Sequence, residues 1–382
     1  MLHAFDNQCT DNITRPLSIE CQDQRQDDAW DEFVVSSPDG HHEQTSLWGQ
    51  VRNQFGWEIR RILIRENGKI VAGAQIQIRS LRRFGRLAYV VFGPCLNAPD
   101  PILENAVIAG LVRHARLLGV RFMVVGLPYG GHYLAPRLMA AGFQLKPSGF
   151  PPQFLEATAV INLSSETEQI ISAMRRSTRR NIRHSLKKGI SVVEQGGEGL
   201  KEFHGLMLAL CKRRKTTPNP AEINFFIELW QRFRPKGWIR LFFAMNGQEP
   251  VSAALAFTFG DWFRVWKVGW SGQHGNLKPN EALWWQMILW ARQNGFRFFD
   301  FVEINSEEAK RLVNSSGDGN GFETVTTFKL GFGGESKFLP GAYYYVFNPA
   351  LRRLFRCGLG YWIKSPGFRK LANPFIRKIY RS

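Results

Sequence analysis

The sequence has few cysteines and no long apolar run, and both shortages restrict the class of protein. Its five cysteines are scattered, odd in number and without a Cys-x-x-Cys pair, which disfavours a disulfide framework and a zinc site. The longest apolar runs, such as LAYVVFGPCL and RFMVVGL, are too short to span a bilayer. The first residues, MLHAFDNQCT, show no basic leader before an apolar core, so we expect a cytoplasmic protein without a signal peptide.

The motifs of three common enzyme classes are also missing. The sequence shows no P-loop, no Ser/His/Asp series and no metal-ligand cluster. These absences exclude NTPase, serine hydrolase and metallohydrolase chemistry, and we expect neither a metal nor a cofactor. What remains is a chain of 382 residues with 44% hydrophobic content, which is enough for two globular domains.

Acidic residues are scarce relative to basic ones, and the formal net charge is +18. The excess is uneven, because residues 1–35 hold eight acids against two arginines, whereas the last 33 residues hold nine Lys or Arg and no acid. Such asymmetry indicates a polyanionic partner, which could be a nucleic acid, a phosphorylated substrate or an anionic membrane face. Composition does not choose among these three.

One short segment concentrates this charge. The run MRRSTRRNIRHSLKKG carries seven Lys or Arg, one His and no acid. Read as a helix, it places four cations at spacings of four, three and four residues, so they share one face and repel one another unless an anion binds opposite. We call this face the basic stripe. Its members are Arg176, Arg180, Arg183 and Lys187, with Arg179 beside them. The alternative is a solvated helix that acids elsewhere in the fold compensate.

The chain also repeats itself. GWEIRRILIRENGKIVAGA begins at Gly56 and GWIRLFFAMNGQEPVSAA begins at Gly237, and each predicts two strands joined by an Asn-Gly turn. Further on, ARLLGVRFM from Ala115 matches ARQNGFRFF from Ala291, each a helix end, a glycine stop and a buried strand. The offsets of 181 and 176 residues keep the order, which predicts an internal duplication.

Each half therefore predicts a mostly antiparallel sheet with helices on its faces, an α+β class with two tandem domains. The apolar positions of ENAVIAGLVRHARLLG and NEALWWQMILWARQNG recur at helical spacing, which predicts one packed helix in each half. We expect a first domain over 1–158, a second over 159–339, and a segment 340–382 that packs on the first. A cleft between the two is the expected binding site.

Five stretches in this order resemble the FemAB family of peptidoglycan bridge aminoacyltransferases and the related CelD-like acyltransferases. They are EQTSLWGQVRNQFGW, FGPCLN, RRSTRRNIRHSLKKGISV, ALWWQMILWARQNGFRFFDF and TTFKLGFGGE. The resemblance spans about residues 30–345 and implies two GNAT-like domains, which agrees with the duplication. It also implies transfer of an aminoacyl group from aminoacyl-tRNA to an amine of a cell-wall precursor. Both of those substrates are polyanions, which suits the basic stripe.

The resemblance carries roles to particular residues. It implies that Arg183, Lys187 and the rest of the basic stripe line a phosphate site of the precursor, and that Arg52 supplies a second contact. It places the family's FK pair at Phe328 and Lys329, where the lysine could hold the donor's phosphate or stabilise charge on the ester carbonyl. A plain surface lysine on a strand edge is the alternative for Lys329.

This chain departs from the family at one place. Family members often carry Asp followed by paired glycines after the core strand of the second domain, whereas FDFVEINSE has Val302 and Glu303 there. Asp300 and Glu303 could act as acid or base, although the family reaction does not clearly need one. For Asp300 we expect a structural role first.

Two other functions remain open at this point. A GNAT-type or CelD-like acyl-CoA-dependent transferase in exopolysaccharide or cell-envelope synthesis would use a QxxGxG or QxxGxA loop, and neither HGNLKPNEALWW nor CLNAPDPILENAV has that spacing. A non-enzymatic RNA-binding protein would need aromatic residues near the basic stripe, and STRRNIRHSLKKG has none. The expected partners are therefore an aminoacyl-tRNA or acyl-CoA donor and a phosphorylated, lipid-linked acceptor. The basic, aromatic C-terminal tail suits an anionic membrane surface as well as RNA, and we expect peripheral contact with the inner face of the cytoplasmic membrane. A docked and solvated terminal helix is the alternative for this tail.

Overall fold

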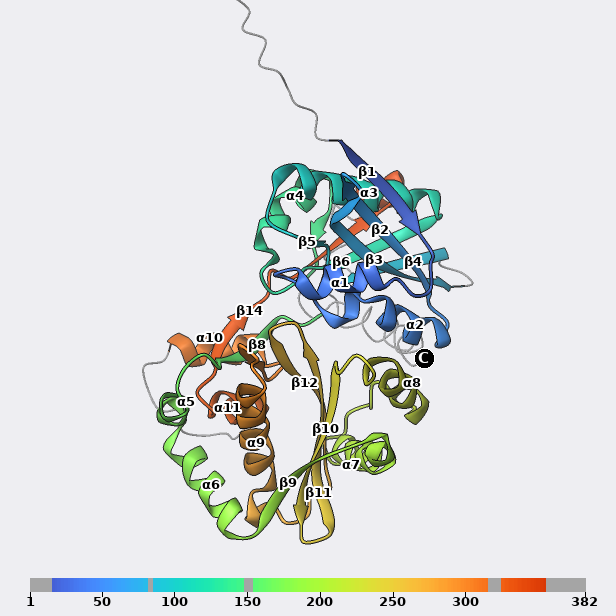
Figure 1. Ribbon diagram of the computed structural model, residues 1–382. Helices are drawn as coiled ribbons and strands as arrows, with labels where there is room; N and C mark the ends of the chain where they lie inside the picture. Colours follow the sequence, from blue (N-terminus) through green and yellow to red (C-terminus); the bar gives the residue numbers. More distant parts are fainter. Residues whose placement is uncertain (1–15, 82–84, 148–153, 315–323, 355–382) are drawn as a thin grey trace, which may run out of the picture.

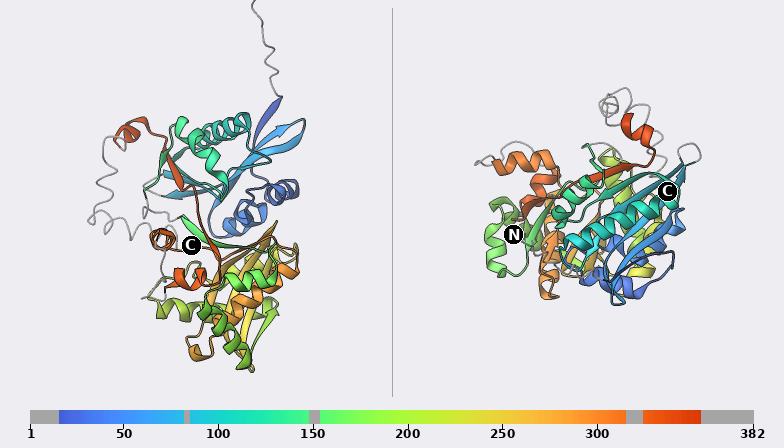
Figure 2. Two further views of the ribbon diagram at one scale, coloured as in Figure 1. Left: turned by 90° about the vertical axis from the view of Figure 1, so that its left-hand side faces the viewer. Right: turned by 90° about the horizontal axis from the view of Figure 1, so that it is seen from above.

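The computed structural model describes residues 16–81, 85–147, 154–314 and 324–354, and all structural statements here concern those residues. The chain forms two sheets, one in each half of the molecule, with helices on their faces (Figures 1 and 2). Each sheet is mostly antiparallel, as expected from the sequence. The C-terminal tail from 355 onward, to which we assigned membrane contact, lies outside the described residues.

The first sheet has the order β1-β2-β3-β4-β6-β15-β7, with β5 paired to β3. Only the β4–β6 pair is parallel among these neighbours. The strands are β1 (Leu17–Gln22), β2 (Glu58–Glu66), β3 (Lys69–Leu81), β4 (Gly85–Val91), β5 (Cys95–Leu96), β6 (Val120–Gly126), β7 (Gln144–Leu145) and β15 (Ala342–Val346). The helices of this half are α1 (Asp28–Ser36), α2 (Ser46–Gln54), α3 (Pro101–Leu117) and α4 (Leu134–Ala140), with the short 3₁₀ turns η1 (His42–Gln44) and η2 (Gly131–Tyr133).

The second sheet has the order β9-β10-β11-β12-β13-β8-β14, and its one parallel pair is β12–β13. The strands are β8 (Ala157–Asn162), β9 (Ile190–Gln195), β10 (Ile239–Asn246), β11 (Glu249–Phe259), β12 (Trp262–Trp270), β13 (Phe298–Asp300) and β14 (Glu335–Phe338). The helices are α5 (Thr167–Ala173), α6 (Arg176–Lys187), α7 (Leu200–Arg213), α8 (Ile223–Phe233), α9 (Pro279–Gln293), α10 (Ser306–Asn314) and α11 (Val325–Leu330), with η3 (Gly197–Gly199) and η4 (Gly275–Leu277). Helix α12 (Pro349–Leu354) follows β15.

The two halves exchange a strand. Read from β1 and from β9, the two sheets have the same order, and the sixth position is filled by β15 in the first and by β8 in the second. β8 follows the first half in sequence yet pairs with β13 and β14, whereas β15 follows the second half yet pairs with β6 and β7. Each closing strand therefore completes the other half's sheet.

The hairpins at equivalent places use different turns. In the first, Asn67 and Gly68 join β2 to β3, and both have positive φ (49° and 79°), as the Asn-Gly motif predicts. In the second, Asn246 still pairs with Glu249, so Gly247 and Gln248 form the turn and only Gly247 has positive φ. A glycine at the first turn position is enough for this hairpin, so the expected Asn-Gly turn is wrong here.

The helices pack as their periodicity predicts. On α3, Val107, Leu111 and Ala115 are fully buried in the core of the first sheet. On α9, the equivalent positions Leu283, Met287 and Ala291 are fully buried in the second core. In Figure 1, α5, α6 and α9 lie on one face of the second sheet and α7 and α8 on the other.

An apolar cluster crosses between the halves. Leu47, Trp48 and Val51 of α2 pack in one core with Phe225 of α8 and Phe257 of β11. Burial of aromatic side chains gives a strong, non-directional attraction, so this cluster holds the halves against each other. Among the described helices, none combines the length and the apolarity that a membrane-crossing segment requires.

Candidate functional site

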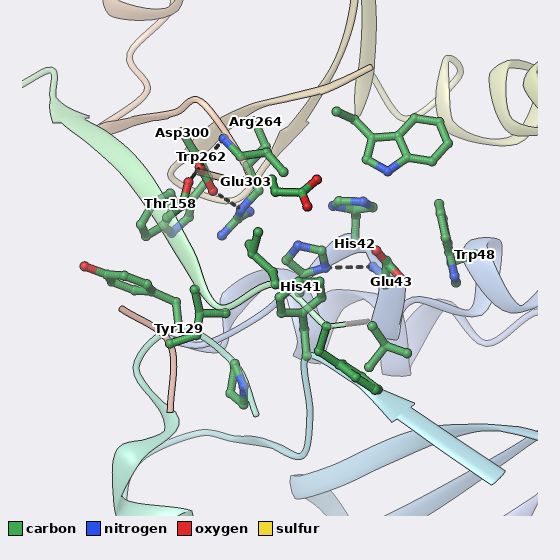
Figure 3. A pocket seen from close by; sticks show the side chains of 18 of the residues that line it. His41, His42, Glu43, Trp48, Tyr129, Thr158, Trp262, Arg264, Asp300 and Glu303 are labelled. Carbon is green, nitrogen blue, oxygen red and sulfur yellow. Dashed lines mark hydrogen bonds and ion pairs between the residues drawn. The ribbon is translucent and has the colours of Figure 1, made fainter. Parts of the chain in front are cut away.

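A cavity of about 410 Å³ lies where the two halves meet. Its wall comes from both, because η1 and α2 of the first half face β12 and the loop after β13 of the second (Figure 3). That volume suits a small ligand or the reacting end of a larger one. Much of the wall is aromatic: Trp48, Trp57, Tyr89, Phe92, Tyr129, Phe154, Phe225, Trp262 and Trp266.

A buried ion pair forms part of this wall. Arg264 of β12 and Asp300 of β13 are each 6% exposed and stand opposite each other in the parallel register, with Arg264 Nε 3.6 Å from Asp300 Oδ2. Asp300 Oδ1 also accepts hydrogen bonds from the hydroxyl of Thr158 and from the amide of Val302, the latter at 2.7 Å. Burial lowers the pKa of Arg264 to about 10, against the opposing charge of Asp300. Asp300 thus ties together three segments of the second half.

The residues after Asp300 have an unusual backbone. Val302 and Glu303 have φ of 51° and 23°, the left-handed region that glycine adopts easily and a β-branched residue resists. Lys329 Nζ donates to the carbonyls of both residues, at 2.6 and 2.7 Å. Burial lowers the pKa of Lys329 to about 8, while the carboxylates of Glu303 and Asp300 act to raise it. The lysine therefore supports a strained turn on the cavity wall.

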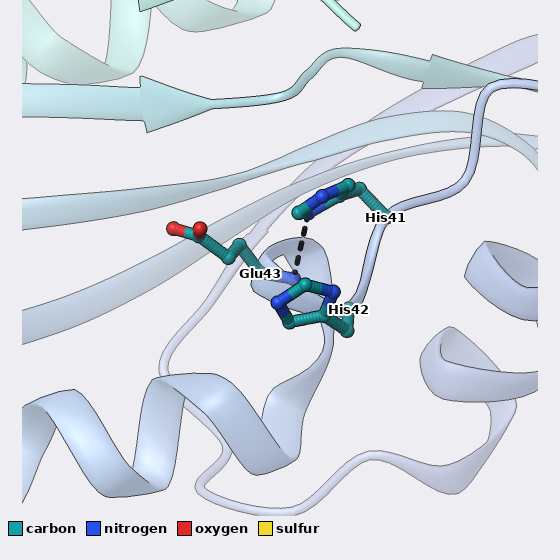
Figure 4. A group of neighbouring side chains, drawn as sticks. All are labelled: His41, His42 and Glu43. Atoms are coloured by element: carbon teal, nitrogen blue, oxygen red, sulfur yellow. Dashed lines mark hydrogen bonds between the residues drawn. The ribbon is translucent and has the colours of Figure 1, made fainter. Parts of the chain in front are cut away.

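Three consecutive residues at the start of η1, its N-cap His41 with His42 and Glu43, line the opposite side. His41 and His42 are buried, and desolvation holds the pKa of each imidazole well below its usual value. His41 Nδ1 accepts the amide of Glu43 at 3.2 Å, whereas both ring nitrogens of His42 have no hydrogen-bond partner among the described residues (Figure 4). Burial raises the pKa of Glu43 to about 7, against the charges of Arg52 and Lys267.

These three side chains could approach one metal ion, because their ligand atoms lie within 4.8 Å of one another. The surrounding charge opposes a cation, however. Arg264 acts on both imidazoles, and Arg52 and Lys267 act on Glu43. We therefore assign no metal to this group and treat Glu43 as a carboxylate that faces the cavity.

Arg52 lies where the sequence analysis expected a substrate contact. It belongs to α2 and lines the cavity, its Nε donates to Gln77 Oε1 at 3.1 Å, and its guanidinium lies 4.5 Å from the centre of the Trp57 ring. Lys267 of β12 faces the same space, with its ammonium 4.9 Å from the centre of the Trp266 ring. One cation from each half thus reaches the cavity, an arrangement that favours an anionic ligand.

The basic stripe is not at this cavity. Arg176, Arg180, Arg183 and Lys187 are exposed along α6 and are not among the residues of its wall. In Figure 1, α6 lies on the outer side of α9, away from the junction of the two halves. The stripe therefore lies outside the cleft where we expected the binding site, and its role in phosphate binding stays a prediction.

Two other predicted site residues have structural contacts. Arg179, which we expected beside the stripe, donates to the carbonyls of Ser172 and Met174 at 2.9 and 3.1 Å. It therefore caps the end of α5, where carbonyls lack helical partners. Phe328, expected beside the substrate, packs against Phe332 and Trp284 with ring centres 5.4 and 6.3 Å apart. Its ring belongs to the second core.

The alternative for Lys329, a surface lysine on a strand edge, is wrong. The residue lies on helix α11 and not on a strand edge, and its ammonium is engaged by the turn at 302–303. The segment TTFKLG around Lys329 forms a helix because Thr324 caps its N-terminus. The Thr324 hydroxyl accepts a hydrogen bond from the amide of Thr327 at 3.1 Å, and the Thr327 hydroxyl accepts one from the amide of Thr324 at 2.8 Å. A direct catalytic role for Lys329 stays a prediction.

Sequence reasoning missed several cavity residues. The signal for His41–Glu43 was available, because a His-His-Glu run just before the Trp48 segment is unusual beside a predicted substrate contact. Arg264 and Lys267 were also visible as two cations within the otherwise apolar strand WFRVWKVGW. A charge in a buried strand needs a partner, so it marks a functional or paired site.

The protonation of Glu43 predicts a pH-dependent stability. Its pKa of about 7 in the folded state exceeds the ordinary 4.5, so the folded state binds the proton more tightly and stability falls as pH rises from about 4.5 to 7. Glu43→Gln removes this loss, and we expect the variant to gain stability over the wild type at pH 8 but not at pH 4.5. Urea unfolding at both pH values measures this. The matched control is the exposed Glu307→Gln, and an equal gain there would contradict the assignment.

Comparison with known proteins agrees with this architecture. A model of the acetyltransferase (GNAT) domain matches residues 172–311. A curated Lipid II:glycine glycyltransferase of Staphylococcus saprophyticus is 25% identical over 236 residues, which are 59% of this chain and 56% of that protein. The chain therefore spans little more than half the length of that relative.

Two solved structures share the fold. The crystal structure of FemX superposes with a TM-score of 0.74 at 18% identity, covering 88% of this chain and 99% of FemX. A tandem GNAT protein from the clavulanic acid biosynthesis pathway superposes with a TM-score of 0.51 at 11% identity, covering 87% and 99%. The chain therefore has two tandem GNAT-like domains and is similar to FemX and to the lipid II:glycine glycyltransferases.

Proposed function

We propose that the protein transfers an aminoacyl group from aminoacyl-tRNA to an amine of a phosphorylated, lipid-linked cell-wall precursor. The observation that carries this proposal is the cavity at the junction of the two GNAT-like domains, into which Arg52 and Lys267 bring one cation from each. The relatives named as glycyltransferases of lipid II support the acceptor class. Besides the Arg264–Asp300 pair, the wall carries Arg52 and Lys267 for an anionic substrate and the carboxylates of Glu43 and Glu303 for an amine.

A donor of acyl-CoA type is the second candidate, because the matching family model describes an acetyltransferase domain. A CoA-binding GNAT site presents glycine-rich backbone amides to the pyrophosphate. The stretch before α9 instead places His274 and Lys278 in left-handed conformations, and its sequence lacks that glycine spacing. This difference favours aminoacyl-tRNA as the donor.

The basic stripe then has a separate part in the proposal. Because it lies outside the cavity, we assign it to the long polyanion that extends beyond the reacting end, which is the tRNA backbone. We expect the double variant Arg183→Ala with Lys187→Ala to weaken tRNA binding and to reduce the slope of log K against log salt by about 1.8, the value for two lost phosphate contacts. Titrations at several salt concentrations measure the slope.

The matched control removes two exposed cations from a helix of the other half. Arg113 and Arg116 of α3 are exposed and three residues apart. Their double alanine variant is expected to leave the salt slope unchanged. An unchanged slope for the Arg183 and Lys187 variant would return the basic stripe to a solvated helix face.

Contact with the inner face of the cytoplasmic membrane is part of this proposal, because a lipid-linked acceptor is anchored there. The experiment that tests the function offers purified protein a lipid-linked muropeptide with either aminoacyl-tRNA or acyl-CoA. Consumption of aminoacyl-tRNA that requires both protein and acceptor supports the proposal. Consumption of acyl-CoA alone supports the second candidate.

A further inference from the structure

The turn at Val302 and Glu303 is built to hold one shape. Three hydrogen bonds fix it: the amide of Val302 donates to Asp300 Oδ1, and Lys329 Nζ donates to the carbonyls of Val302 and Glu303. The positive φ of both residues is strained for side chains with a Cβ. Strain of this kind persists only where the surroundings impose it, and it clusters at functional sites.

The turn directs one carboxylate into the cavity. Figure 3 shows the side chain of Glu303 pointing toward the space between Arg264 and His42. The residue is exposed, and no hydrogen bond or ion pair to a described residue occupies its carboxylate. Asp300, by contrast, is fully engaged by Thr158, Val302 and Arg264. Glu303 is therefore the carboxylate of this turn that is available to a ligand.

We propose that Glu303 is a catalytic carboxylate that takes a proton from the attacking amine, and that Lys329 is a positioning residue that acts through it. This inference rests on the proposed function. The acceptor's ammonium transfers one proton to the Glu303 carboxylate. The free amine then attacks the acyl carbonyl, a C–N bond forms, and the C–O bond to the tRNA ribose breaks. The departing oxygen accepts the proton that Glu303 gained, and the new amide nitrogen gives its surplus proton to water. The ammonium and the ester thus become the amide, the free ribose hydroxyl and one released proton, so atoms and charge balance.

The groups around Glu303 suit this role. Lys267 of β12 and Lys329 of α11 place positive charge near the Glu303 carboxylate. Across the cavity, His41 and His42 stay neutral because burial holds the pKa of each imidazole well below its usual value. Glu43 is the other carboxylate near Lys267, so it can help to attract the ammonium.

A double-mutant cycle separates this proposal from direct catalysis by Lys329. We expect Glu303→Gln to lower kcat/KM about 10²-fold or more, the usual size for a lost general base. If Lys329 acts through Glu303, the Lys329→Met change adds little further loss in the Glu303→Gln background. Losses that multiply would instead mean that Lys329 contacts the substrate, and would overturn its positioning role. Lys310→Met, which removes an exposed lysine paired with Glu307, is the matched control.

A rescue variant tests the positioning role directly. Glycine adopts positive φ without strain, so Val302→Gly should let the turn keep its shape without the lysine. We expect Val302→Gly to raise kcat/KM at least tenfold when it is added to Lys329→Met. Added to Glu303→Gln, it should leave kcat/KM unchanged. Absence of rescue in Lys329→Met, with normal thermal unfolding of the double variant, would contradict the proposal.

A binding measurement keeps this inference distinct from the proposed function. Calorimetric titration compares a muropeptide that has a free amine with the same muropeptide N-acetylated. We expect the wild type to prefer the free amine, Glu303→Gln and Lys329→Met to lose that preference, and Val302→Gly to restore it in Lys329→Met. If these binding preferences are found but the protein transfers no aminoacyl group, the proposed reaction is refuted and the amine site is supported. If the protein does transfer the group but Glu303→Gln still prefers the free amine, only the amine site is refuted.

Discussion

Asp300→Ala is expected to lower the free energy of unfolding by about 3–5 kcal/mol, the usual cost of removing one partner of a buried ion pair. The change leaves Arg264 charged and enclosed, with no described carboxylate in an ion pair with it. It also removes the acceptor for the Thr158 hydroxyl and the Val302 amide, so β8, β12 and the strained turn lose a common contact. Urea denaturation of the wild type and the variant measures the loss.

Two controls define the cause. Asp261→Ala breaks an exposed pair with Arg297, whose Nη1 lies 3.2 Å from the carboxylate, and should cost at most about 1 kcal/mol. Asp300→Leu combined with Arg264→Met removes both charges and should recover much of the stability lost in Asp300→Ala. A loss below about 1 kcal/mol in Asp300→Ala would show that the pair does not organise the second half.

The exchanged strand predicts an even larger effect. A fragment that ends at residue 147 lacks β15, which lies between β6 and β7 and buries Tyr343 and Tyr345. Loss of each buried aromatic side chain costs about 3–5 kcal/mol, and whole domains are stable by only about 5–15 kcal/mol. We therefore expect the fragment 1–147 to show no cooperative unfolding transition when circular dichroism follows its denaturation in urea.

The rescue is specific to the strand. Fusing residues 339–354 to the end of the fragment through a flexible linker should restore a cooperative transition, whereas the same residues in scrambled order should not. The fragment 154–339 already contains β8 and thus every strand of the second sheet, so we expect it to fold more readily than 1–147. Cooperative unfolding of 1–147 without β15 would contradict the role that we assign to the exchange.

Local sequence patterns predicted the elements well. Turn residues, glycine stops and helical periodicity act over a few neighbours, so the first hairpin, α3 and α9 follow from the sequence. The exchange of β8 and β15 could not be predicted in this way. The pattern of a strand shows that it is buried but does not show with which sheet it pairs. The register of the second hairpin also escaped, since NG permits a turn at either of two positions.

The candidate site was predictable only in part. Arg52 was found because it follows a family motif, and the structure places it on the cavity wall. The basic stripe was conspicuous by charge alone, and charge density on an exposed helix does not reveal its distance from a cleft. Glu303 was named from the sequence as a residue that could act as acid or base. Arg264 and Lys267 escaped because their meaning depends on what the other half brings opposite them.

The turn at 302–303 links the family resemblance to this chain's own chemistry. Where the family that the sequence resembles is expected to carry glycines, this chain has Val302 and Glu303 in conformations that favour glycine. Lys329 and Asp300 hold the turn, so the strain is tolerated. The turn itself needs no side chain at Glu303, so the presence of a carboxylate there indicates a role for it. We interpret Glu303 as a functional carboxylate that the chain carries at the cost of backbone strain.

The most direct test of the central claim is the mass of the acceptor after reaction. Purified protein is incubated with a lipid-linked muropeptide and, in separate reactions, aminoacyl-tRNA or acyl-CoA. We predict that the muropeptide gains the mass of one amino-acid residue with aminoacyl-tRNA only, and that ribonuclease treatment of the donor abolishes the gain. A gain with acyl-CoA alone, or no gain with either donor, would contradict the account.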